Sequence, residues 1–177
     1  MPQIQVIEEE NAKGKVKAVY DELRSVFGKV PGVMKALSPW PDMLELYTKA
    51  IGLIMLSETL LIRAVKEIIA ELVSKINKCD YCLTYYKSFM VDVGLTSPYA
   101  IAADYQTATI LDTDKKILAY VEKVTRHAYK TTDTDVEGLK GCGWSEEQVL
   151  EEKLYVGLFS NINRWGSVTK MIELVAS

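Results

Sequence analysis

"KEIIAELVSKINKCDYC", residues 66–82, carries a helical pattern that stops just before two cysteines spaced three residues apart. Apolar residues recur there and just upstream at heptad spacing, namely at Leu61, Val65, Ile68, Leu72 and Ile76. Because Ile62, Ile69 and Val73 widen this apolar stripe, we expect a central helix with a broad buried face, which Ser57 or Thr59 begins.

Helical periodicity also dominates the rest of the chain, and neither long apolar–polar alternation nor an Asn-Gly or Asp-Gly hairpin turn occurs. The pattern predicts an all-α fold in a single domain over residues 1–177. We expect an N-terminal arm (1–56), a core (57–94) and C-terminal helices (95–177). Further helices are expected at 12–27, up to about 56 with Asp42 as the N-cap, up to Gly94, up to Tyr105, from 112 to 127, before "GCG", and after a capping box at Ser145–Gln148.

Composition excludes several functional classes. The net charge of −3 and the pI near 5.3 leave no basic surface for nucleic acid or anionic lipid. Charged residues interrupt the most apolar stretch, the N-terminus has no signal-peptide pattern, and three cysteines fit a reducing compartment. We therefore expect a cytoplasmic protein. A zinc site would need Cys142 and His127 beside the cysteine pair, and no cofactor fingerprint occurs, so we expect neither metal nor cofactor.

The two cysteines, Cys79 and Cys82, can form and break a disulfide because residues three apart share one helix face. Asn77 is expected to cap a helix that begins at Lys78. The Cys79 sulfur would then lie exposed near the positive helix end, which favours its thiolate, and Cys82 would be less exposed. The residues alone leave two interpretations open, a redox centre and a pair of small buried hydrophobes.

Glu67 is a candidate general base for a thiol. Twelve residues of unbroken helix would separate it from Cys79 by about 18 Å, so the helix must break at "INK" and fold back for the two to meet. The polar face would then include Arg63, Glu71 and Ser74. The alternative is a simple ion pair between Glu67 and Arg63, four residues apart on a solvated or interface face.

The segment 66–82 resembles the core motif of the AhpD-like, or carboxymuconolactone decarboxylase, family, in which Glu, Ser, Asn and C-x-x-C occur at these spacings. Residues 19–44 and 111–166 resemble the arm and the C-terminal half of its peroxidase-related members. The resemblance implies an all-helical bundle whose core hairpin carries the cysteines at a helix N-terminus. It also implies a homo-oligomer, as a trimer, hexamer or dimer. The implied activity is a thiol peroxidase in which Cys82 attacks the hydroperoxide, Cys79 resolves it and Glu67 activates Cys82.

One position departs from the family motif, because Tyr86 stands where the family has a histidine four residues after the second cysteine. Tyrosine donates a hydrogen bond but is a poor proton shuttle at neutral pH. We therefore expect weakened or altered peroxidase activity, with Tyr86 bonded to Glu67 or to a water beside Cys82. The expected partners are a hydroperoxide and a small dithiol or protein-thiol reductant. The alternatives are a redox-sensing or non-catalytic oligomer and, with less support, a lactone decarboxylase.

Overall fold

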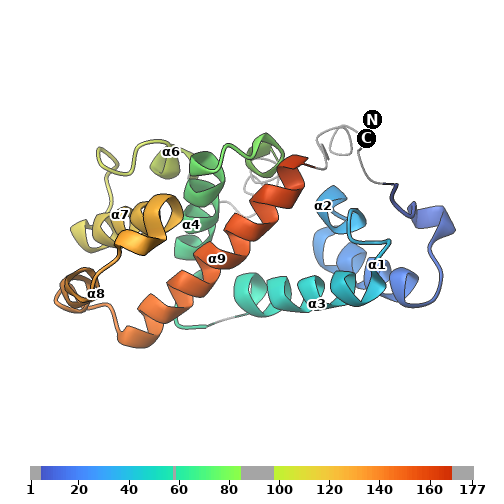
Figure 1. Ribbon diagram of the computed structural model, residues 1–177, viewed down its shortest axis with the longest axis horizontal. Coiled ribbons are helices and arrows are strands. Elements are labelled where there is room, and N and C mark those ends of the chain that lie inside the picture. Colours follow the sequence, from blue (N-terminus) through green and yellow to red (C-terminus); the bar gives the residue numbers. More distant parts are fainter. Residues whose placement is uncertain (1–4, 58, 85–97, 169–177) are drawn as a thin grey trace. The chain divides into compact units, whose positions relative to one another are not determined.

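The computed structural model describes residues 5–57, 59–84 and 98–168 (Figure 1), and in these ranges every regular element is a helix. The prediction of an all-α fold is confirmed. The chain divides into two compact units, Met1–Ser57 with Trp165–Ser177, and Glu58–Arg164. The cysteine pair belongs to the second unit. The predicted single domain stays a prediction.

The first unit is built on α1 (Gly14–Phe27), whose apolar stripe packs against α3 (Pro41–Ile51). The sequence suggested Asp42 as the N-cap of α3, but Asp42 does not cap this helix. Trp40 takes the N-cap position and a proline follows at N1, where its missing N–H is not needed. The remaining elements of this unit are η1 (Glu9–Asn11), α2 (Gly32–Lys35) and a π-helical turn, η2 (Gly52–Leu56).

The second unit is built around α4 (Arg63–Ile76), which packs against α6 and α7 and is crossed by α9 (Figure 1). The predicted capping box at the start of α9 is confirmed, because Ser145 N–H donates to Gln148 Oε1 (2.9 Å) and Gln148 N–H to Ser145 Oγ (3.2 Å). The other elements are α6 (Pro98–Ala103), α7 (Asp112–His127), η3 (Ala128–Lys130), α8 (Asp133–Lys140) and α9 (Glu146–Val168). In the described ranges no helix is long and apolar enough to cross a membrane.

Helix α4 begins later than the sequence predicted, at Arg63 rather than at Ser57 or Thr59. The turn before it is held by α9, because the Glu151 carboxylate accepts the backbone N–H groups of Leu60 (3.0 Å) and Leu61 (3.3 Å). A carboxylate supplied by another helix thus bonds the backbone just ahead of the α4 N-terminus.

The polar face of α4 is buried rather than solvated. Glu67, Glu71 and Ser74 are all at most 1% exposed, whereas Ile62, part of the predicted apolar stripe, is 69% exposed. Burying carboxyl groups costs free energy unless they are paired or protonated. Because α4 turns this face inward, it places two carboxyl groups and a hydroxyl group in the interior of the unit.

Candidate functional site

The centre of the candidate site is the disulfide between Cys79 and Cys82, whose Cα atoms are 5.3 Å apart. The residues lie three apart in the first turn after α4, so both sulfurs reach the same face without any long-range rearrangement. The redox interpretation of the pair needs this proximity. Two inert buried cysteines would not require a bond.

The helix boundary before the pair differs from the predicted one. Asn77 does not cap the second helix but ends α4, where its N–H donates to Val73 O (2.9 Å). Lys78 then takes the left-handed conformation, with φ 55°, and the Cys79 N–H donates to Ser74 O (3.0 Å). The predicted break at "INK" is thus confirmed, and the next helix begins at Asp80, two residues later than expected.

Cys79 itself occupies the N-cap position of that helix. Its sulfur accepts the backbone N–H of Cys82 (3.3 Å), and its carbonyl accepts the N–H of Leu83 (3.0 Å). A sulfur in this position lies at the positive end of the helix dipole and accepts one of the N–H groups that the helix leaves unpaired. Cys79 therefore lies at the positive end of the helix dipole, as predicted, although the N-cap is Cys79 itself rather than Asn77.

The predicted exposure of the two sulfurs is wrong. Cys79 is 0% exposed and Cys82 is 4% exposed, so neither residue is open to solvent and Cys82 is not the less exposed. The cause is that α4 buries its polar face, together with the turn that follows it, inside the unit. A reagent must therefore reach both sulfurs through an opening of the protein or along a narrow path.

Asn163 of α9 contacts the pair from a distant part of the chain. Its Nδ2 donates to the Cys82 sulfur (3.0 Å) and to Ser74 Oγ (3.0 Å), and its Oδ1 accepts from Asn77 Nδ2 (3.0 Å). Asn163 is 1% exposed. Each sulfur therefore has one N–H donor, from the backbone for Cys79 and from this amide for Cys82.

Sequence reasoning missed Asn163, although a signal was present. The buried face of α9 follows a spacing of three and four residues through Val149, Glu152, Val156, Phe159 and Asn163. Two polar side chains interrupt this otherwise apolar stripe. A polar residue on a buried stripe needs a hydrogen-bond partner, so this pattern indicates a candidate site residue.

Glu67 lies on the buried face of α4, 0% exposed, and its Oε1 accepts a hydrogen bond from Arg63 Nε. The predicted ion pair with Arg63 therefore forms, but the carboxylate is buried rather than solvated. Burial raises the pKa of Glu67, and the Arg63 guanidinium opposes that rise. Its Oε2 has no hydrogen-bond partner in the described residues.

The relation of Glu67 to the sulfurs is indirect in the described residues. Glu67 and Ser74 are seven residues apart and share one face of α4, about 10 Å from each other along the axis. Ser74 contacts Asn163, which contacts Cys82. No described hydrogen bond joins Glu67 to either sulfur, so its role as a base stays a prediction.

Other buried polar groups lie on α9. Glu152 is 0% exposed, neither carboxyl oxygen has a partner in the described part of the chain, and burial raises its pKa to about 8. Tyr155, also fully buried, stacks on Phe159 with ring centroids 4.9 Å apart. Burial and the nearby Glu67 raise the pKa of Tyr155 well above its usual value. Burial therefore favours the protonated form of the Glu152 carboxyl group at neutral pH.

The other residues singled out by the sequence lie apart from the pair or outside the described ranges. Tyr86 falls in 85–97, beyond the described residues, so its predicted bond to Glu67 stays a prediction. Cys142 is a free, half-buried thiol whose sulfur accepts from Lys116 Nζ (2.9 Å). His127 ends α7, as predicted, and its ring meets that of Tyr129 edge-on at 6.0 Å.

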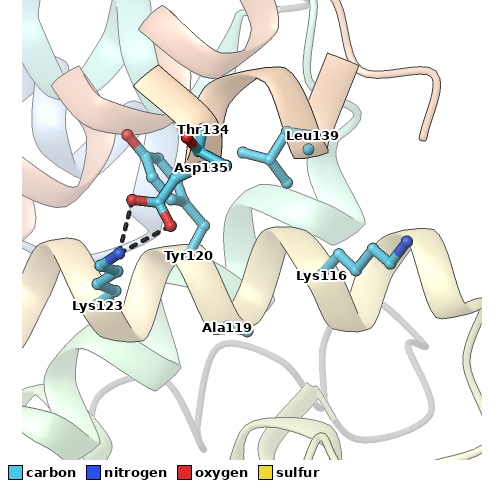
Figure 2. A pocket seen from close by; sticks show the side chains of 8 residues that line it. Lys116, Ala119, Tyr120, Lys123, Thr134, Asp135 and Leu139 are labelled. Carbon is cyan, nitrogen blue, oxygen red and sulfur yellow. Dashed lines mark hydrogen bonds and ion pairs between the residues drawn. The ribbon is translucent and has the colours of Figure 1, made fainter. Parts of the chain in front are cut away.

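A cavity of about 370 Å³ lies between α7 and α8 (Figure 2). Lys123 and Asp135 form an ion pair in it, with Nζ 2.7 and 2.6 Å from the two carboxylate oxygens. Neither cysteine of the pair lines this cavity, and neither does Glu67. The cavity therefore gives no support to a substrate site at the disulfide.

Solved structures show the same arrangement of helices. A peroxidase-related protein with an alkylhydroperoxidase AhpD core, from Ralstonia eutropha JMP134, matches with a TM-score of 0.85 at 21% identity, over 96% of this chain and 90% of its own. The fold is AhpD-like. The AhpD-like neighbours also include a peroxidase-related protein from Silicibacter sp. TM1040, with a TM-score of 0.80 at 24% identity, over 96% of this chain and 93% of its own.

The AhpD-like fold is also that of the debrominase Bmp8, solved in complex with 2,3,4-tribromopyrrole. Its TM-score is 0.79 at 16% identity, over 96% of this chain and 90% of its own. No family model and no curated protein matches this sequence. At these identities the likeness establishes the fold, and the activity must be argued from the residues of this chain.

Proposed function

We propose that this protein is a thiol-dependent hydroperoxidase that cycles between a Cys79–Cys82 dithiol and the disulfide. The observation that carries the proposal is the bonded pair with one N–H donor at each sulfur. Hydrogen bonds to sulfur favour the thiolate, which is the nucleophile in reactions with peroxides and with disulfides. The peroxidase-related neighbours of the same fold support this choice of substrate.

The proposed oxidation has two steps. The Cys82 thiolate attacks the terminal oxygen of the hydroperoxide, the O–O bond breaks, and the alkoxide takes a proton to leave as an alcohol. The Cys79 thiolate then attacks the resulting sulfenic acid, the S–S bond forms and the hydroxyl leaves as water. A dithiol reductant restores the pair by exchange through a mixed disulfide.

Glu67 is the proposed base for this cycle. Burial raises its pKa, which makes the carboxylate a stronger base, and its Oε2, which has no hydrogen-bond partner among the described residues, can accept the proton. The proton must travel from the sulfur by way of water or of side chains between them. With Tyr86 in place of the family histidine, this transfer is expected to be slower than in family members that keep the histidine.

A single-turnover assay tests the proposal. Fully reduced protein carries three thiols, and the structure keeps Cys142 free in the oxidised state. Addition of one equivalent of an organic hydroperoxide should leave one thiol and release the alcohol. Cys142→Ser is the matched control and should react at the same rate. Loss of no thiols would reject a peroxidase and favour a redox-sensing or non-catalytic role.

The debrominase neighbour supplies a second substrate for the same assay. A dithiol can also reduce a carbon–bromine bond, giving bromide, a carbon–hydrogen bond and the disulfide. Thiol loss with 2,3,4-tribromopyrrole but not with hydroperoxide would overturn the choice of substrate while keeping the redox pair. Thiol loss with the hydroperoxide alone would support the proposal.

The assembly and the cell compartment also remain proposals. A homo-oligomer is supported by large apolar side chains that are more than half exposed in this chain, namely Leu60, Ile62, Leu150 and Leu154. Leu60 and the start of α9 are adjacent, because Gln148 Nε2 donates to the Leu60 carbonyl (3.1 Å). Light scattering on the purified protein would test this, and a monomer at micromolar concentration would contradict it.

A further inference from the structure

We infer that Asn163 is a further catalytic residue, whose side-chain amide binds the sulfur of Cys82 and stabilises it as a thiolate. This inference rests on the proposed dithiol–disulfide cycle. Nδ2 lies 3.0 Å from the sulfur, and both residues are buried, at 1% and 4% exposed. A hydrogen bond to a charged sulfur away from water is stronger than one to a neutral sulfur.

The neighbours of Asn163 determine which end of its amide meets the sulfur. Ser74 has a single hydroxyl hydrogen, and Ser74 Oγ donates it to Ala70 O (2.7 Å). Ser74 Oγ can therefore only accept from Asn163, so the nitrogen of the amide, and not its oxygen, faces Ser74. The same nitrogen faces Cys82, because both contacts are made by Nδ2.

Asn77 holds the opposite end of the amide. Its Nδ2 donates to Asn163 Oδ1 (3.0 Å) and also lies 3.4 Å from Ser160 Oγ. The first of these hydrogen bonds holds the Asn163 oxygen away from the cysteine pair. The three side chains come from α4, its C-cap and α9, so the donor is positioned before any reaction begins. Pre-positioned donors are effective because they need no reorganisation when charge develops.

The amide acts in both halves of the cycle. In the oxidative half it favours the attacking Cys82 thiolate. In the reductive half, a thiolate of the dithiol attacks the Cys79 sulfur, the Cys79–Cys82 bond breaks, and the electron pair of that bond goes to the Cys82 sulfur. Asn163 then stabilises the leaving thiolate, and the second thiol of the reductant displaces Cys79 from the mixed disulfide.

The test isolates the Cys82 thiol in a Cys79→Ser, Cys142→Ser background. Serine is a favoured N-cap residue, so the first substitution keeps the helix start. The rate of alkylation by iodoacetamide as a function of pH reports the pKa of Cys82. In Asn163→Ala that pKa should rise by about one unit, since a hydrogen bond to the charged form is lost. Asn163→Asp, which places an acceptor against the sulfur, should raise it further.

Asn161→Asp is the matched control, because it makes the same substitution on an exposed position of the same helix and should leave the pKa of Cys82 unchanged. An unchanged pKa in Asn163→Ala would overturn the inference. If Asn163→Asp does not fold, the alanine variant decides alone. The titration uses no peroxide, so its failure is distinct from failure of the proposed peroxidase activity.

Discussion

The side-chain nitrogen of Asn163 lies 3.0 Å from the sulfur of Cys82, although 81 residues separate them along the chain. The first turn after α4 provides the two sulfurs, and α9 provides the donor for one of them. Because Asn163 also binds Ser74, the same side chain ties α9 to α4. The redox pair is therefore completed by the packing of two helices rather than by the C-x-x-C segment alone.

Replacing the proposed base should slow the peroxidase reaction. Glu67→Gln removes a proton acceptor while keeping the size of the side chain, and we expect the single-turnover rate to fall about 100-fold or more. Stopped-flow consumption of hydroperoxide measures this rate. Glu147→Gln, an exposed substitution on α9, is the control and should react like the unmodified protein. A full rate in Glu67→Gln would remove the assigned role.

The guanidinium of Arg63 should set the pH at which Glu67 works. Arg63 lowers the pKa of Glu67, which burial raises, so Arg63→Met should raise that pKa further. A base acts only when ionised, and the rate therefore increases as pH rises through its pKa. The acidic limb of the pH–rate profile should move to higher pH in the variant. A limb that stays in place would show that another group controls it.

Glu152 should make the folded state less stable as pH rises. Burial raises its pKa from an ordinary 4.5 to about 8, so the folded chain holds a proton that the unfolded chain has released. Stability present below about pH 4.5 is therefore lost as pH rises towards about 8. The loss is on the order of a few kcal/mol, at about 1.4 kcal/mol per unit.

Urea denaturation across that pH range measures the effect of Glu152. Glu152→Gln cannot ionise and should lose much less stability with rising pH. Glu146→Gln, on an exposed position of the same helix, should keep the pH dependence of the unmodified protein. The assignment would be wrong if both variants behaved alike.

Replacing Lys78 by glycine should stabilise the folded protein. Its φ of 55° lies in the left-handed region, where a Cβ costs about 1 kcal/mol. Lys78→Gly should raise the free energy of unfolding of the oxidised protein by up to about 1 kcal/mol, less the entropy that glycine loses on folding. Lys78→Ala removes the same charge but keeps the Cβ, so it should show no gain. Equal gains in both would point to the charge instead.

Glu151 should stabilise the start of α4 and the buried ammonium of Lys66. Its carboxylate accepts hydrogen bonds from two backbone N–H groups just before α4. Its Oε1 also lies 3.3 Å from Nζ of Lys66, and Lys66 is 0% exposed. Glu151→Gln should lower the free energy of unfolding by about 2 kcal/mol, the range for hydrogen bonds to charged groups. Chemical denaturation measures this, with Glu147→Gln as control.

Much of the local structure could be predicted from spacing. Three local features follow from residues within a turn or two of each other: the helix at 112–127, the capping box of Ser145 and Gln148, and the break at "INK". Helix starts were less predictable. Side-chain caps were expected at Asp42 and Asn77, but Pro41 decided the first, and at the second the chain turns through Lys78 so that Cys79 becomes the cap.

The sequence by itself determined an all-helical chain and a cysteine pair that can bond, because an i, i+3 spacing places two side chains on one helix face wherever that helix lies. Only the tertiary structure decided that Glu67 and both sulfurs are buried, and that Asn163 faces Cys82. Burial and long-range contacts depend on which helix covers which face. The sequence therefore cannot distinguish a polar side chain that faces water from one that, like Asn163, binds a sulfur.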